Sequence, residues 1–161
     1  MFRLADWFVR QELARQARII TTKTEINGEI NLPELNFTLN GTADRIDILK
    51  GGTAHIYDYK TGKPPTPAQQ LHFDKQLLLE VEILRRGGFI GLGPLKVAGA
   101  TYIGLDNSPR ELPAPMDEAD AWADFSKLLR AYPSAAQGYT APRALPKAPA
   151  SSGFGHPAPH R

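Results

Sequence analysis

The sequence predicts an α/β fold in which helices flank a small mixed sheet. Its 161 residues suffice for one domain with a buried core, and 42% of them are hydrophobic and 22% charged, as in globular proteins. Apolar periodicities change in kind along the chain, in the order helix, several strands, helix, strand and helix. This order is typical of a sheet covered by helices.

The first half of the chain is expected to hold one helix followed by strands. Apolar positions recur at helical spacing over residues 4–18. Residues 19–31 are rich in β-branched side chains, and Asn27-Gly28 predicts a hairpin turn that pairs 22–26 with 29–32. Three more strands are expected, the last two joined by a tight turn at Lys50-Gly51-Gly52-Thr53: residues 35–40, 43–49 and 54–60.

The second half is expected to hold two helices and one strand. A Pro-rich break ends at Pro67, which suits the first turn of a helix at about 68–86 with Thr66 as its cap. Gly87-Gly88 ends that helix. Two further elements follow: a strand at 96–104 and a helix at 116–131.

Charge and composition divide the chain near residue 131. Residues 132–161 contain six prolines and no acidic residue, which predicts a disordered, basic tail behind a domain of residues 1–131. Residues 1–125 hold 14 basic and all 17 acidic side chains, a net charge of −3, and the remainder carries +5. A slightly acidic body suits a subunit or fragment that borrows phosphate binding from elsewhere.

Several classes of protein are excluded by what the sequence lacks. It contains no cysteine, which rules out disulfides, thiolate zinc sites and iron–sulfur clusters. No apolar run is long enough to span a membrane, and the early Asp6 argues against a secretory signal. There is no Gly-x-x-x-x-Gly-Lys-Ser/Thr, the motif of an ATP-driven motor. We expect a cytoplasmic protein.

Two acidic strands point to a metal site. Side chains alternate along a strand, so Asp58 and Lys60 share one face of residues 54–60. Pairing across the Gly51-Gly52 turn brings Asp44 opposite Asp58. Two carboxylates with open coordination positions bind Mg²⁺ or Mn²⁺, and the backbone carbonyl of Tyr59 is a further candidate ligand. Lys60 would orient the attacking water and offset charge on a phosphate.

Three linked motifs resemble the RecB-type nuclease domain of the PD-(D/E)XK superfamily. They are Gly41-Thr42-Ala43-Asp44-Arg45-Ile46-Asp47, then Asp58-Tyr59-Lys60-Thr61-Gly62, then Gln76-Leu77-Leu78-Leu79-Glu80. The similarity covers residues 3–130 and is closest to the alphaproteobacterial AddB-type subfamily. It implies a restriction-endonuclease-like core and a Mg²⁺-dependent DNA exonuclease of double-strand break repair. DNA, helicase domains and an AddA-type subunit are the implied partners.

The resemblance assigns a role to each motif residue. Asp44 and Asp58 would hold the metal, Lys60 would be the catalytic lysine, and Gln76 would complete the site. Two departures stand out. Glu80 replaces the Tyr that often follows the Gln by four residues, and one helical turn separates it from Gln76, so it is a further candidate. Where many relatives carry a His or Glu ligand on the first helix, the nearest candidate is Glu12.

Other residues of the motifs have structural explanations. Asp47 alternates to the face opposite Asp44 and is expected to pair with Arg45. Tyr57 and Tyr59 are expected to pack, and Glu25 is an alternative acid with the character of an exposed strand residue.

Alternatives to an active exonuclease domain remain open. The departures at Glu80 and Glu12 leave room for a catalytically silent DNA-binding or subunit-docking module. A spacer-processing nuclease of the same superfamily is a third possibility, against which the lack of cysteine argues. The chain is also much shorter than a helicase–nuclease subunit, which suggests an excised domain or a stand-alone relative.

Overall fold

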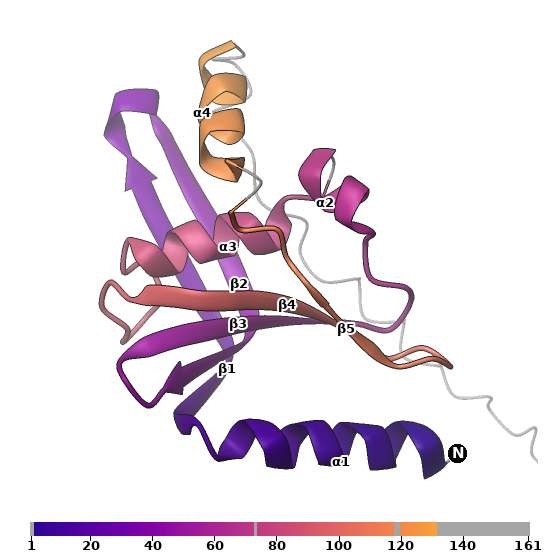
Figure 1. Ribbon diagram of the computed structural model, residues 1–161. Helices are drawn as coiled ribbons and strands as arrows, with labels where there is room; N and C mark the ends of the chain where they lie inside the picture. The colour runs from indigo at the N-terminus through magenta and orange to yellow at the C-terminus, as the bar shows by residue number, and fades with distance from the viewer. Residues whose placement is uncertain (1, 73, 118–119, 132–161) are drawn as a thin grey trace, which may run out of the picture.

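One five-stranded sheet organises the described part of the chain, residues 2–72, 74–117 and 120–131 of a computed structural model (Figure 1). Its strands lie side by side in chain order, and β3 and β4 run parallel while the other neighbours run antiparallel. The prediction of a mixed sheet is therefore confirmed. The strands are β1 (Ile19–Leu32), β2 (Phe37–Leu49), β3 (Thr53–Lys60), β4 (Lys96–Gly104) and β5 (Arg110–Pro113).

Helices cover both faces of this sheet. They are α1 (Phe2–Gln16), the short 3-10 helix η1 (Pro33–Leu35), α2 (Pro67–His72), α3 (Gln76–Arg85) and α4 (Ala121–Ala131). Helix α1 lies against one face and α3 against the other (Figure 1). Because β3 and β4 are parallel, the chain must cross over between them, and α2 and α3 form that crossover. Among the described helices none has the length and apolar character needed to cross a membrane.

The main core lies between α3 and the sheet. Leu77, Val81 and Leu84 of α3 are at most 2% exposed, and they face Ile46 and Ile56 of the central strands, which are fully buried. Each such side chain contributes about 1.5–3 kcal/mol by leaving water. This packing fixes α3 over β2 and β3, the two strands that carry the acidic motifs.

The predicted hairpin at Asn27-Gly28 is wrong. Strand β1 continues through these residues, and Gly28 pairs with Gly41 of β2. The chain turns later, at η1, where Asn36 adopts a left-handed φ of 47°. Gly28 serves close packing, because a Cβ there would lie 2.6 Å from the Phe89 ring.

The single helix predicted at 68–86 is divided into α2 and α3 by a short non-helical connection that contains Asp74 and Lys75. Thr66 caps α2 as expected: its hydroxyl accepts from the Gln69 amide at 3.3 Å, and the Gln69 side chain accepts from the Thr66 amide at 2.8 Å.

Other predicted boundaries hold to different degrees. The helix at 4–18 and the strands at 54–60 and 96–104 are confirmed within about two residues. Helix α4 starts at Ala121 rather than at 116, and β5 has no counterpart among the predicted elements. The predicted tail of residues 132–161 lies outside the described residues.

Candidate active site

The β2–β3 hairpin brings the two motif aspartates together as predicted. Arg45 pairs with Tyr57 and Ile46 with Ile56, so the next step along the register sets Asp44 beside Asp58. The Asp44 carboxylate also accepts a hydrogen bond from the backbone amide of Tyr59 at 2.8 Å. This bond ties Asp44 to the strand that carries Asp58 and Lys60.

Asp58 and Lys60 form an ion pair on the same face of β3. Lys60 Nζ lies 3.0 Å from Asp58 Oδ2. Asp58 is 5% exposed, and burial raises its pKa although the Lys60 ammonium opposes the shift. Burial also disfavours the charged lysine, but the Asp58 carboxylate outweighs this and raises the pKa of Lys60. The ammonium is therefore held charged beside the carboxylate.

Helix α3 adds Gln76 and Glu80 to this face. The two residues are one turn apart, and Gln76 Nε2 donates to Glu80 Oε1 at 3.2 Å. Glu80 is 3% exposed. Burial raises the pKa of Glu80 to about 8, and the charges of Asp58 and Asp44 add to the rise. Helix α3 therefore adds the Glu80 carboxyl group to the two aspartates, Asp44 and Asp58, of the strands.

Two residues at this site have no motif that could have revealed them. Tyr102 is paired in register with Asp58 across β3 and β4, and its hydroxyl donates to Asp74 Oδ1 at 3.3 Å. The Tyr102 ring lies beneath Lys60, with Nζ 5.6 Å from the ring centroid. In the sequence, Tyr102 belongs to an apolar strand and Asp74 to a stretch predicted as one continuous helix. Their proximity depends on the parallel β3–β4 pairing and on the break before α3.

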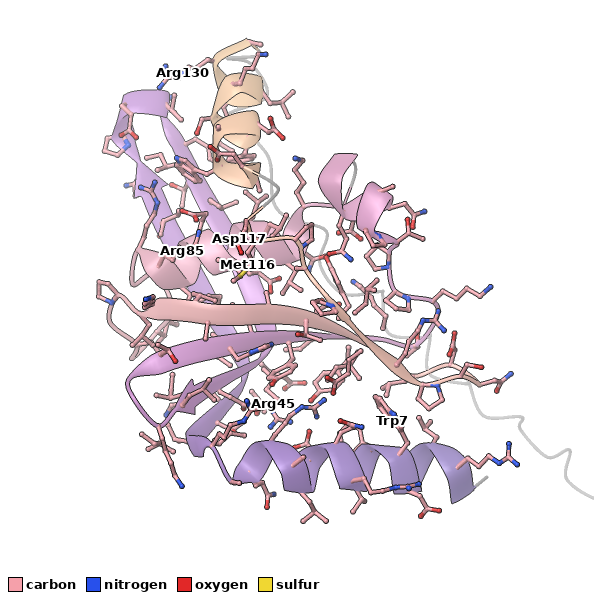
Figure 2. The ribbon with its side chains drawn as sticks, viewed as in Figure 1. Trp7, Arg45, Arg85, Met116, Asp117 and Arg130 are labelled. Carbon is pink, nitrogen blue, oxygen red and sulfur yellow. The ribbon has the colours of Figure 1, made fainter. Side chains whose placement is uncertain are left out.

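Glu12 lies elsewhere, which corrects its assignment as a first-helix metal ligand. Its Oε1 accepts from Arg45 Nη1 at 2.7 Å and also pairs with Arg15. Arg45 alternates with Asp44 along β2, so it points to the opposite face of the sheet. Trp7 and Arg45 both lie in the space between α1 and the sheet (Figure 2). The described structure therefore places Glu12 in the packing of α1 and not beside Asp44 and Asp58.

The expected pairing of Arg45 with Asp47 is confirmed on that opposite face. Arg45 Nε and Nη2 donate to the two Asp47 oxygens at 2.8 and 2.9 Å. Asp47 is fully buried and also accepts from Thr22 Oγ1 at 2.8 Å. Burial disfavours the Arg45 charge, yet hydrogen bonds to Asp47 and Glu12 more than compensate and raise the Arg45 pKa. This network attaches α1 to the sheet.

The two tyrosines of β3 also pack on the α1 side. Tyr57 stacks on His55 with ring centroids 4.4 Å apart, and the guanidinium of Arg15 lies 4.9 Å from the Tyr57 centroid. The Tyr59 hydroxyl accepts from Arg45 Nη1 at 3.2 Å. Glu25, the alternative acid, is exposed on β1 with a φ of 49°.

The donor chemistry of the site fits a hard divalent cation. No group of three His, Asp or Glu side chains within the described ranges is arranged as a ready-made metal site. Asp58 Oδ2 and Glu80 Oε2, however, are buried and make no hydrogen bond with any described residue. The Lys60 ammonium lies close to Asp58 Oδ2 but outside hydrogen-bond geometry. Carboxylate oxygens are the ligands that Mg²⁺ and Mn²⁺ prefer.

Comparisons with known proteins indicate the family of this chain. The family model described as the PD-(D/E)XK nuclease superfamily, whose nucleases typically use divalent metals, matches residues 1–152. An uncharacterized protein of Rickettsia bellii (strain RML369-C) is 35% identical over 89 residues, which are 53% of this chain and 11% of that protein. An uncharacterized protein of Rickettsia felis (strain URRWXCal2) is 33% identical over 110 residues, 60% of this chain and 13% of that protein.

A solved structure titled "Crystal structure of SSO0001" is 18% identical, with a TM-score of 0.46, and the match covers 84% of this chain and 60% of that one. The chain spans little more than a tenth of the length of the curated relatives it matches.

Proposed function

The chain belongs to the PD-(D/E)XK nuclease superfamily, and we propose that it is a metal-dependent exonuclease domain that hydrolyses phosphodiester bonds at broken DNA ends. The observation that carries the proposal is the grouping of Asp44, Asp58 and Lys60 by one hairpin, with Asp58 and Lys60 3.0 Å apart. A carboxylate pair beside an ammonium is suited to phosphoryl chemistry.

In the proposed site, Asp44 and Asp58 hold Mg²⁺ or Mn²⁺, with Glu80 as a third carboxylate and the Tyr59 backbone carbonyl as a further ligand. A bound cation would polarise the phosphate and lower the pKa of a bound water. Lys60 orients the attacking water and offsets the charge that develops on the phosphate. Gln76 holds Glu80, since its side chain donates to Glu80 Oε1.

The biological setting is also part of the proposal. We assign the domain to a helicase–nuclease of the AddB type in the cytoplasm, working beside helicase domains and an AddA-type subunit in double-strand break repair. The order of the three motifs supports this assignment, as does the net charge of −3 over residues 1–125, which suits a domain that relies on partners to hold DNA.

The deciding experiment measures binding and cleavage in parallel. Melting temperature and degradation of end-labelled linear DNA are followed with EDTA, Mg²⁺ and Mn²⁺, in the wild type and in Asp58→Ala and Lys60→Ala. We expect stabilisation by metal, and end degradation that both variants lose. Glu82→Gln is the matched control, because Glu82 is on α3 but pairs with Arg85 and Arg86. Metal-dependent cleavage retained in both site variants would overturn the proposal.

A silent DNA-binding or docking module is the second candidate. It is favoured by Glu80 in place of the family's usual Tyr and by the engagement of Glu12 with Arg45. Such a module has no need of a metal. If Mg²⁺ and Mn²⁺ leave the melting temperature unchanged and no cleavage occurs at high protein concentration, the silent module becomes the better description.

A further inference from the structure

On the neighbouring strand β4, Lys60 has a glycine and an aromatic ring as its neighbours. Its partner in register is Gly104, so no side chain from β4 lies directly beside the lysine stem. Two residues earlier on β4, Tyr102 is 1% exposed, and its ring faces the Lys60 ammonium at 5.6 Å. An ammonium at this distance from an aromatic face is attracted by the ring quadrupole.

The Tyr102 ring is itself held in place at its far end. Its hydroxyl donates to Asp74 Oδ1 at 3.3 Å. Asp74 is fixed in turn by its backbone amide, which donates to the Gln69 carbonyl at 2.8 Å. The connection between α2 and α3 therefore serves to place one carboxylate against the phenol under Lys60.

Asp74 is linked to Lys60 through the Tyr102 ring, whose hydroxyl donates to the Asp74 carboxylate and whose centroid lies 5.6 Å from Lys60 Nζ. Lys60 is therefore held from two sides, by Asp58 on its own strand and by the Tyr102 ring that Asp74 secures. In the proposed function the charge of Asp58 is neutralised by a cation, and Asp58 then holds the lysine less strongly.

We propose that Asp74 and Tyr102 are positioning residues that form a second anchor for the Lys60 ammonium, one that keeps it over the site when the charge of Asp58 is engaged elsewhere. The catalytic purpose of this anchor rests on the proposed nuclease function. The anchor itself is a property of the unliganded protein and can be tested without cleavage or metal.

The first test is structural and uses NMR in EDTA. Asp58→Asn removes the charge of the first partner with little change in shape. We expect nuclear Overhauser effects between the Lys60 ε-protons and the Tyr102 ring to persist in Asp58→Asn and in Asp58→Asn/Glu82→Gln. They should disappear in Asp58→Asn/Asp74→Ala, in which no acceptor is left for the Tyr102 hydroxyl. Their disappearance in Asp58→Asn alone, or their persistence in the double variant that lacks Asp74, would overturn the anchor.

The second test is kinetic and also covers the case in which Asp58→Asn fails to fold. Loss of one hydrogen bond should lower kcat about fivefold in Asp74→Ala and in Tyr102→Phe, with KM unchanged. The variant that combines Asp74→Ala with Tyr102→Phe should be no slower than the slower of the two single variants, because both changes break the same hydrogen bond. An unchanged kcat, or a change confined to KM, would contradict the anchor. If the wild type does not cleave DNA, the nuclease proposal fails. The NMR result then still decides whether Asp74 and Tyr102 anchor Lys60.

Discussion

Asp44 and Tyr59 are joined across the β2–β3 hairpin by a hydrogen bond of 2.8 Å from the Tyr59 amide to the Asp44 carboxylate. The bond occupies one oxygen of Asp44 and sets its carboxyl group beside the Asp58–Lys60 pair. It also gives Asp44 two separable roles, since an asparagine can keep the acceptor oxygen but not the charge.

Asp44→Asn should therefore separate stability from metal binding. We expect the free energy of unfolding in EDTA to change by no more than about 1 kcal/mol, because the amide oxygen still accepts from Tyr59. The rise in melting temperature on adding Mn²⁺ should be lost. Asp44→Ala, which removes the acceptor as well, should also be destabilised in EDTA. An Asp44→Asn protein that keeps its full Mn²⁺ response would remove Asp44 from the metal site.

Glu80 provides a test of the third carboxylate. Its Oε2 is buried without a hydrogen-bond donor among the described residues, and its pKa of about 8 keeps the carboxyl largely protonated near neutral pH when no metal is bound. We expect Glu80→Gln to leave the protein at least as stable as the wild type in EDTA and to weaken stabilisation by Mn²⁺ by about 1 kcal/mol or more. Thermal melts at a series of Mn²⁺ concentrations measure both effects. The control on the same helix, Glu82→Gln, should keep the wild-type response, and equal responses in the two variants would exclude Glu80 as a ligand.

Local pattern sufficed to predict the part of this site that lies on one hairpin. Alternation and a Gly-Gly turn together fix Asp44, Asp58 and Lys60, because a two-strand register depends only on nearby residues. Asp74 and Tyr102 required the parallel pairing of β3 with β4, which is set by the α3 crossover and the packing of its apolar face. No short stretch of sequence encodes such a long-range contact.

The wrong hairpin at Asn27-Gly28 has a similar cause. Asn-Gly is a strong turn signal, but here tertiary packing overrides it. Asn27 accepts a hydrogen bond from the Thr42 hydroxyl at 2.8 Å within the ladder, and Gly28 lies under the Phe89 ring. The prediction of Glu12 as a metal ligand has a comparable weakness. Helical periodicity indicates which face of α1 is buried, but not which face of the sheet α1 covers.

Gly28→Ala tests the packing that replaces the hairpin. A Cβ at residue 28 would lie 2.6 Å from the Phe89 ring and 2.7 Å from Ile83, so side chains of the core must move. We expect a loss of about 1–3 kcal/mol in the free energy of unfolding, measured by urea denaturation. Gly93→Ala is the matched control because a methyl group at residue 93 would have no neighbour within 4 Å. A Gly28→Ala protein as stable as that control would mean that β1 does not run tightly under Phe89.

His55 predicts a pH dependence of stability that is independent of the proposed active site. Burial lowers the pKa of His55 to about 4, with the neighbouring charges of Arg15, Arg18 and Arg45 acting in the same direction and Asp47 opposing them. The unfolded chain takes up this proton near pH 6.5, whereas the folded protein resists it down to about pH 4. Stability should therefore fall as the pH drops through this window, by at most about 1.4 kcal/mol per pH unit from this group.

Urea denaturation between pH 4 and pH 7.5 measures that slope. His55→Gln keeps a side chain that can bond the Thr101 hydroxyl, which lies 2.8 Å from His55 Nε2, but it does not titrate. The free energy of unfolding of His55→Gln should depend less steeply on pH than that of the wild type over the same range. Identical slopes in the two proteins would mean that His55 is not buried as a neutral ring.

Glu12→Gln distinguishes packing of α1 from metal ligation. Glu12 accepts from Arg45 at 2.7 Å and pairs with Arg15, so loss of its charge weakens charge-assisted hydrogen bonds to two largely buried guanidinium groups. We expect a loss of about 1–3 kcal/mol in the free energy of unfolding. The increment in melting temperature that Mn²⁺ produces should equal that of the wild type, because Glu12 and Asp44 lie on opposite faces of the sheet. A variant that loses the Mn²⁺ increment without loss of stability in EDTA would return Glu12 to the metal site, since a residue that only secures α1 cannot act on a cation held beyond β2.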